Sequence, residues 1–264
     1  MRFHQPETVD DALKLLADDE DARCIAGGAT LVAMMNADLI APSALVSLRS
    51  IAELKAIDRG NDGSVRIGAM AKHKAVASFD SFDPGQAVVQ EAAQVIGHPA
   101  IRNMGTIGGS ISHADAAADY PAALAAADAA IEIAGANARR EVGATDFFID
   151  YLETALEPGE IVVGVRLPAS ADAASAYAKF ARVEGDFATV SAAAPGSAAS
   201  LTLIAVISAA CLSTSARRTS LSRCSSAWAA TLHADPSCWL CAGDNAHHDR
   251  AFVGIVFGLH VSSA

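Results

Sequence analysis

Residues 101–110 read Ile-Arg-Asn-Met-Gly-Thr-Ile-Gly-Gly-Ser and place three glycines within five residues. Glycine has no Cβ and adopts φ > 0 readily, so this run predicts a turn whose backbone amides are open to a ligand. Residues 86–95, just before it, are apolar at helical spacing and predict a helix. His98-Pro99 is expected to end that helix, because the residue before a proline avoids the α region.

A second glycine turn lies earlier in the chain, at residues 26–31, which read Ala-Gly-Gly-Ala-Thr-Leu. A short strand at 23–26 and a helix at 29–35 are expected beside it, so amides at the turn would face outward. Successive amides can form a concave nest for a diphosphate, and Thr30 can add a hydroxyl donor. For a Gly-Gly pair taken alone, a tight turn without a ligand is the alternative.

Two glycine turns that converge could hold one diphosphate from two sides, which neither turn predicts by itself. Neither turn matches the G-x-G-x-x-G fingerprint or the P-loop, so a doubly wound nucleotide-binding domain is not supported. The remaining periodicity predicts a mixture of helices and strands. Helices are expected at 9–16, capped by Thr8, and at 122–129, and strands at 45–48, 65–69, 130–133 and 160–167.

Composition excludes several classes of function. The formal net charge is −11, which argues against a nucleic-acid groove because phosphate backbones require a basic surface. No apolar run approaches the roughly 20 residues that cross a bilayer, so no transmembrane segment is expected. The first six residues lack a signal-peptide pattern, and Cys24 is the only cysteine before residue 200, which is typical of a reducing compartment. A cytoplasmic protein is therefore expected.

In combination, these motifs resemble the FAD-binding (medium) subunit of the molybdenum hydroxylase family, of the xanthine dehydrogenase and carbon monoxide dehydrogenase type. The matching motifs follow the family's order over residues 1–194. They are Ala26-Gly27-Gly28, residues 101–110, His113-Ala114-Asp115 with Asp119, Pro158-Gly159-Glu160-Ile161, Lys179-Phe180-Ala181-Arg182 and Gly185-Asp186-Phe187-Ala188.

The resemblance implies an α+β fold. A two-subdomain FAD-binding domain of the vanillyl-alcohol-oxidase (PCMH) type would occupy residues 1–175, with subdomains at about 1–58 and 59–175. A small α+β C-terminal domain would occupy 176–264, with its first strand within 176–194. Residues 196–264 are atypical, because they contain four Arg, no Lys, three Asp and no Glu. This segment is expected to be aberrant or incomplete, translated out of frame or otherwise foreign to the fold, which would leave an unpaired sheet edge.

The resemblance also implies a set of FAD-binding residues. The pyrophosphate and ribityl chain would lie against Ala26, Gly27, Gly28, Ala29, Thr30 and Leu31. The phosphates would be cradled from the other side by Thr106, Gly108, Gly109 and Ser110. Asp119 would bond a ribose or ribityl hydroxyl, and Ile161 or Val162 with Lys179 would flank the adenine or the outer part of the cofactor. No catalytic residue and no metal ligand is assigned, and the spacing of Cys238, Cys241, His247 and His248 is read as accidental.

The implied function is electron relay by the flavin subunit of a multi-subunit oxidoreductase. A large molybdopterin subunit would oxidise substrate, a small subunit with two [2Fe-2S] clusters would pass the electrons on, and FAD on this chain would deliver them to an external acceptor. A dimer of heterotrimers is the expected assembly. The alternatives are a self-sufficient FAD-dependent oxidase, which would need a substrate cap domain, and a cofactor-free interaction protein that retains the fold.

Overall fold

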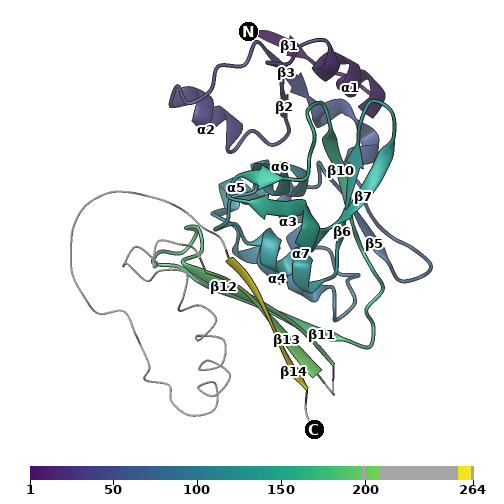
Figure 1. Cartoon of the computed structure of the whole chain (residues 1–264), viewed down its shortest axis with the longest axis vertical. Coiled ribbons are helices and arrows are strands. Elements are labelled where there is room, and N and C mark those ends of the chain that lie inside the picture. The colour runs from purple at the N-terminus through teal and green to yellow at the C-terminus, as the bar shows by residue number, and fades with distance from the viewer. Residues whose placement is uncertain (198–199, 208–254, 263–264) are drawn as a thin grey trace, which may run out of the picture.

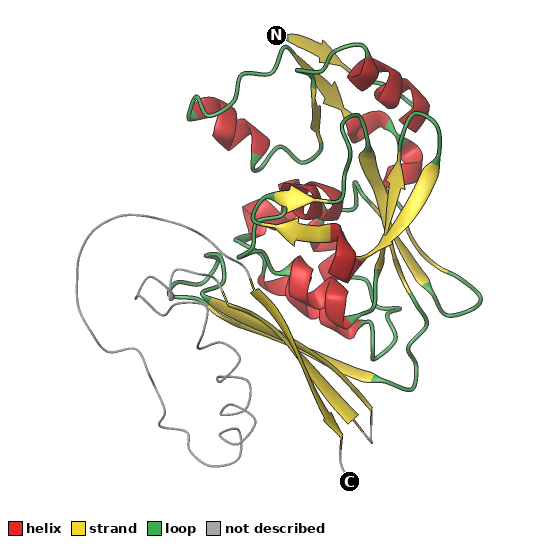
Figure 2. Ribbon diagram, in the orientation of Figure 1, coloured by secondary structure: helices red, strands yellow, loops and turns green. Residues whose placement is uncertain are grey.

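Three main sheets and a layer of helices make up the protein (Figure 1). The structure is a computed structural model that describes residues 1–197, 200–207 and 255–262. The helical layer lies between a five-stranded and a four-stranded sheet, and a small parallel sheet lies at the N-terminal end (Figures 1 and 2). This mixture of helix and antiparallel strand confirms the expected α+β class.

The N-terminal sheet is parallel, with the strand order β1 (Arg2–His4), β3 (Ala44–Ser47) and β2 (Arg23–Ile25). Helix α1 (Val9–Ala17) covers it and begins as predicted, because the Thr8 side chain accepts a hydrogen bond from the Asp11 amide at 3.1 Å. Helix α2 (Leu31–Asn36) follows β2 but has no buried residue and stands apart from the other elements (Figure 2). The short helices η1 (Leu48–Ser50) and η2 (Ala52–Leu54) lead to the next sheet.

The central sheet is antiparallel throughout and has five strands. Their order is β4 (Ile57–Arg59), β5 (Val65–Gly68), β10 (Ile161–Leu167), β6 (Ala130–Ala134) and β7 (Arg139–Gly143). Strand β10 is central because its sequence is apolar on both faces: Val165 and Leu167 enter the main hydrophobic cluster, whereas Val163 enters the cluster beneath the N-terminal sheet. The predicted subdomain boundary near residue 58 falls inside β4.

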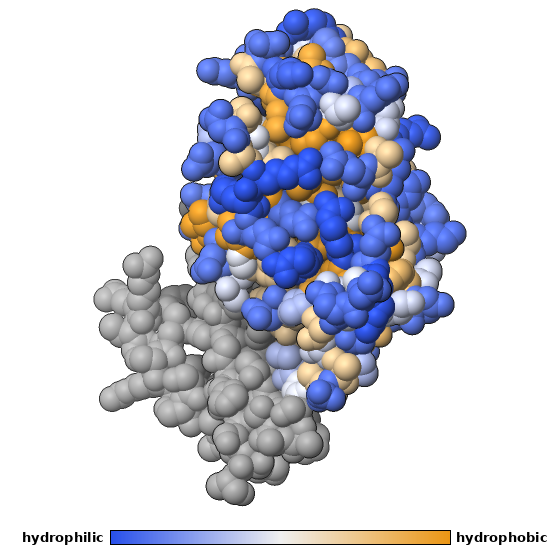
Figure 3. All heavy atoms as spheres, turned by 90° about the vertical axis from the view of Figure 1, so that its right-hand side faces the viewer, coloured by the Kyte–Doolittle hydropathy of each residue, from blue (hydrophilic) through white to orange (hydrophobic). Residues whose placement is uncertain are grey.

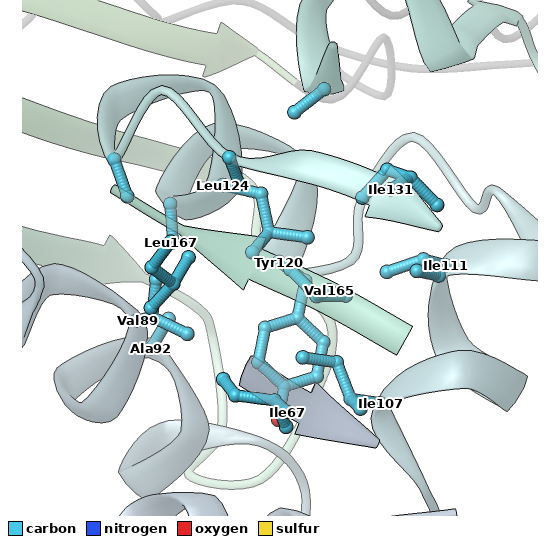
Figure 4. Close-up of a cluster of buried hydrophobic side chains, with 14 of the residues drawn as sticks. Ile67, Val89, Ala92, Ile107, Ile111, Tyr120, Leu124, Ile131, Val165 and Leu167 are labelled. Atoms are coloured by element: carbon cyan, nitrogen blue, oxygen red, sulfur yellow. The ribbon is translucent and has the colours of Figure 1, made fainter. Parts of the chain in front are cut away.

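Helices pack on one face of this sheet and form the main core with it. They are α3 (His73–Ala77), α4 (Ala87–Val95), α5 (Pro99–Met104), α6 (Ile107–His113), α7 (Tyr120–Ala126) and α8 (Ala144–Phe147), with the hairpin β8 (Phe148–Asp150) and β9 (Glu153–Thr154) after α8. Figure 4 shows Tyr120 and Leu124 of α7 among Ile107, Ile131 and Val165. Burying such side chains contributes most of the stability of a core of this kind.

The C-terminal sheet has the antiparallel order β11 (Ala174–Phe180), β12 (Val190–Ser197), β13 (Ser200–Ile207) and β14 (Ile255–Ser262). It docks on α4 through β11: the Tyr177 amide donates to Glu91 Oε2 at 2.7 Å, and the Ser175 hydroxyl accepts from the Val88 amide at 2.9 Å. The predicted boundary at residue 175 therefore lies inside β11.

Three predictions of local structure are corrected. The glycine run expected as one turn forms α5 and α6, because Pro99 opens a helix at its first position and Thr106 caps the next. Residues 176–194 form parts of two strands, joined by a loop in which Gly185 has φ +87°. Finally, β12 is not an unpaired edge, since β13 and β14 extend the sheet; the remainder of 196–264, with Cys238 and Cys241, lies outside the described residues.

The exposed face of the central sheet is charged. Arg66 of β5 pairs with Glu132 of β6 at 2.8 Å, and Arg166 of β10 pairs with Glu141 of β7. Hydrophilic residues predominate in the view from this side (Figure 3). These pairs are half-exposed, so each adds little to stability. Among the described residues, none of the helices is both long and apolar enough to cross a membrane.

Gly68 in β5 provides a test of the close packing between the sheet and η2. A Cβ at this position would lie 2.3 Å from the backbone oxygen of Leu54, and its φ is not positive, so only the collision opposes a side chain. We expect Gly68→Ala to lower the free energy of unfolding by about 1–3 kcal/mol, as overpacking does. Gly143→Ala, whose nearest neighbour atom would lie at 3.7 Å, is the control and should change it by less than about 0.5 kcal/mol. Equal urea midpoints for the two variants would contradict the close packing of Gly68 against Leu54.

Candidate functional site

The two glycine segments meet in the fold, although β3, β4, β5 and the helices α2, α3 and α4 lie between them in sequence. A Cβ at Gly27 would lie 2.1 Å from the Met104 oxygen and 2.8 Å from the Gly105 Cα. One at Gly109 would lie 3.7 Å from the Ala26 Cβ. The segments converge as the sequence led us to expect, and the glycines are needed because the two backbones touch.

The segment at 26–31 has free backbone donors. Within the described residues, no amide from Gly27 to Leu31 donates a hydrogen bond to a protein group. Gly28 has φ +77°, which turns the chain between β2 and α2, and Thr30 is an exposed N-cap whose side chain caps no amide. Unpaired consecutive amides at a strand-to-helix turn are the donor set that an anionic diphosphate requires.

The start of α6 differs, because its amides already have partners. Ile107 donates to Ala71 O at 3.0 Å, Gly108 to Ala69 O at 2.9 Å, and Gly109 to Thr106 Oγ1 at 3.2 Å. The expected open nest at this turn is therefore corrected: in this structure, Gly108 allows close packing, since a Cβ there would lie 2.6 Å from the Ala69 Cβ. The Ser110 hydroxyl is half-buried and lacks a partner among the described residues, so it remains available to a ligand.

Asp119 and Lys179, both predicted to contact the cofactor, also contact each other. Lys179 Nζ lies 2.9 Å from Asp119 Oδ2, and the Tyr177 hydroxyl donates to Asp119 Oδ1 at 2.7 Å. The side chains are only 4% and 8% exposed. Burial raises the pKa of Asp119, and the bonds from Tyr177 and Lys179 oppose that rise. Each carboxylate oxygen accepts one of these bonds and keeps a further lone pair, so the bond to a ribose or ribityl hydroxyl stays a prediction.

Ile161 and Val162 lie inside the protein. They are 5% and 4% exposed on β10 and belong to the two hydrophobic clusters on its opposite faces. Their predicted place beside the adenine or the outer part of the cofactor stays a prediction, and both side chains also pack in the core. A pocket of about 320 Å³ between α3, α4 and α5, lined by Lys74, Gln94 and Arg102 among others, does not include either glycine segment.

The sequence analysis missed His73, which lies directly behind the site. The side chain is 4% exposed, and its Nδ1 lies 3.1 Å from the Tyr120 hydroxyl. Burial, and secondarily the charge of Arg102, lowers the pKa of His73 to about 4. The signal that could have found it is a lone histidine after the apolar strand at 65–69. No group of acidic, His and Cys side chains able to hold a metal occurs in the described part of the chain.

Comparisons with known proteins agree on one family. Residues 1–170 match the family described as the FAD binding domain in molybdopterin dehydrogenase. The chain is 36% identical over 184 residues to the 6-hydroxypseudooxynicotine dehydrogenase complex subunit alpha of Paenarthrobacter nicotinovorans, covering 69% of this chain and 62% of that protein. It is 38% identical over 194 residues to the carbon monoxide dehydrogenase medium chain of Afipia carboxidovorans, covering 72% and 67%. The match thus leaves about a third of each relative uncovered.

A solved structure gives the same relationship. The crystal structure of quinoline 2-oxidoreductase from Pseudomonas putida 86 superposes with a TM-score of 0.74 at 34% sequence identity, covering 78% of this chain and 73% of that one.

The Asp119–Lys179 pair generates a stability prediction. Lys179→Met leaves a buried carboxylate without its cation, so we expect a loss of about 3–5 kcal/mol in the free energy of unfolding. Adding Asp119→Asn removes the stranded charge and should recover part of the loss. Lys14→Met breaks an exposed pair with Asp11 and should change stability by less than about 1 kcal/mol. Urea unfolding of the four proteins measures this; a double variant no more stable than Lys179→Met would contradict it.

His73 generates a pH prediction. Its pKa is lowered from 6.5 to about 4 in the folded state, so between these values the unfolded chain binds a proton that the folded chain does not. Stability should therefore fall as the pH drops through this window, by up to about 1.4 kcal/mol for each pH unit. Urea midpoints between pH 4.5 and 7 measure the slope. His73→Asn cannot titrate and should show a shallower slope; identical slopes would refute the assignment.

Proposed function

This chain belongs to the family of FAD binding domains in molybdopterin dehydrogenases, and from that premise we propose that it is the FAD-carrying electron-transfer subunit of a multi-subunit, molybdopterin-dependent dehydrogenase. Its task is to pass electrons from iron–sulfur clusters on a partner to an external acceptor. The observation that carries the proposal is the run of unpaired amides at 27–31, held against the segment at 104–109 by glycine contacts.

The residues present fit FAD. A chain of net charge −11 favours neutral donors for a diphosphate, and the backbone amides at 27–31 supply them. Ala26 to Leu31 would hold the pyrophosphate and ribityl chain, and Thr106, Gly108, Gly109 and Ser110 would bound the site on the other side. When bound, FAD supplies the capacity to take up two electrons and release them to an acceptor.

The chain's own contribution is binding and orientation. Gly27 lets the two segments approach closely enough to hold one molecule, and the hydroxyls of Ser110 and Thr30 are available as further donors. The Asp119–Lys179 pair fixes α7 to β11 and so sets the position of the C-terminal sheet beside the helical layer. No proton transfer by a side chain is required for relay, so we assign no catalytic residue.

The assembly belongs to the same proposal. We place a large molybdopterin subunit and a small subunit with two [2Fe-2S] clusters beside this chain, in a dimer of heterotrimers, in the cytoplasm. We place FAD-binding subdomains at about 1–58 and 59–175 and the C-terminal domain at 176–264. The names of the relatives, a complex subunit and a medium chain, support a multi-subunit setting.

Reconstitution of the full chain with FAD tests the proposal. We expect absorption bands near about 370 and 450 nm that persist after gel filtration. Gly27→Ala places a Cβ 2.1 Å from the Met104 oxygen and should weaken FAD binding by at least about tenfold, whereas Gly143→Ala should not change it.

The same preparation separates the alternatives. A relay subunit should keep its flavin oxidised when substrates are added alone and lose the 450 nm band only with an external reductant such as NADH. Bleaching by a substrate without partners would favour a self-sufficient oxidase. Absence of flavin bands after reconstitution would favour a cofactor-free interaction protein.

A further inference from the structure

The His73 ring lies against the backbone of Gly105. A Cβ at Gly105 would lie 2.5 Å from His73 Nε2 and 2.7 Å from its Cδ2, far inside van der Waals contact. The His73 amide also donates to the Gly105 oxygen at 3.1 Å. Gly105 has φ −62° and ψ 153°, a conformation open to any residue, so the close approach of the ring, and not backbone strain, is what requires glycine here.

The orientation of the ring is fixed from the core side. The Tyr120 hydroxyl lies 3.1 Å from His73 Nδ1, the two ring centroids are 5.5 Å apart, and Tyr120 is fully buried in the main hydrophobic cluster. A buried hydroxyl needs a partner, and a histidine held by one ring nitrogen has a fixed plane. The imidazole is therefore a rigid spacer between α7 and the Gly105 bend.

On its other side, the bend touches the predicted cofactor segment. Gly27 packs against the Met104 oxygen and the Gly105 Cα. A shift of the Gly105 bend would therefore displace Gly27 as well. The Arg102 guanidinium bonds the Ile96 and Gly97 oxygens at 3.0 and 2.6 Å and holds the rest of α5 in place. Tyr120, His73, Gly105 and Gly27 thus form one continuous stack from the core to the free amides.

We propose that His73 is a positioning residue for the cofactor site: its imidazole, held by Tyr120, sets the distance between the Gly105 bend and Gly27 and thereby determines how tightly the amides at 27–31 hold a dinucleotide diphosphate. The inference rests on the proposed function. It assigns His73 no contact with the cofactor and no part in electron transfer.

A mutant cycle in the full chain tests this assignment. Gly105→Ala should collide with the ring, displace the bend and weaken FAD binding by about tenfold or more. Adding His73→Ala makes room for the new Cβ and should restore most of that loss. Gly27→Ala is the matched control, because its collisions are with the Met104 oxygen and the Gly105 Cα, which His73→Ala does not remove. FAD dissociation constants come from titration of flavin fluorescence.

The expected result is that His73→Ala restores FAD affinity to Gly105→Ala but not to Gly27→Ala. A general loss of stability would not produce this difference. The idea is overturned if Gly105→Ala binds FAD equally weakly with and without His73, or if His73→Ala restores Gly27→Ala to the same degree. His73→Asn, which retains a hydrogen-bonding partner for Tyr120, covers the case in which His73→Ala does not fold: it should hold FAD more tightly than His73→Leu.

Urea unfolding of the same variants separates this idea from the proposed function. If the wild-type chain binds no FAD, the proposed function fails and the positioning of a cofactor site fails with it. The Gly105–His73 coupling in the free energy of unfolding would then show only that the stack is structural. If the chain binds FAD and the cycle shows no coupling in affinity, the positioning role fails alone.

Discussion

The structure depends on a backbone-to-backbone contact between two distant segments, Gly27 on one side and Met104 with Gly105 on the other. No side chain fits between them, so the contact can form only where the chain carries glycine. It fixes the N-terminal parallel sheet against the helical layer and leaves a row of unpaired amides beside the junction. In a family that binds FAD, this is how a strongly acidic chain can offer neutral donors to a diphosphate.

The surroundings of that contact are rigid for identifiable reasons. Strand β10 contributes side chains to both hydrophobic clusters and joins them. The Asp119–Lys179 pair and the His73–Tyr120 bond connect α7 to β11 and to the Gly105 bend, respectively. Each polar group lies in a place of low dielectric, where a satisfied bond restricts geometry and an unsatisfied one is costly. Helix α2, which follows the free amides, differs from these surroundings because none of its residues is buried.

Two of the predicted cofactor residues have partners that the sequence did not reveal. Asp119 and Lys179 are 60 positions apart and pair with each other, a contact that no local pattern encodes. Ile161 and Val162, also predicted to lie near the cofactor, belong to a strand whose side chains are buried in the two hydrophobic clusters. The amides of Gly108 and Gly109 were predicted to be open to a ligand. In the structure they donate to the Ala69 oxygen and to Thr106 Oγ1. Burial and partner identity depend on neighbours remote in sequence.

The sequence by itself determined the α+β class, the Thr8 cap of α1, the strands β2, β3, β5, β6 and β10, and the two glycine segments with their family, because periodicity, capping and glycine act over a few residues. Only the tertiary structure decided which of the two segments has free amides, which charged residues pair, and that His73 stands behind Gly105. These depend on which backbones and side chains meet across the fold, and such contacts are set by packing of the whole core, not by any one stretch of sequence.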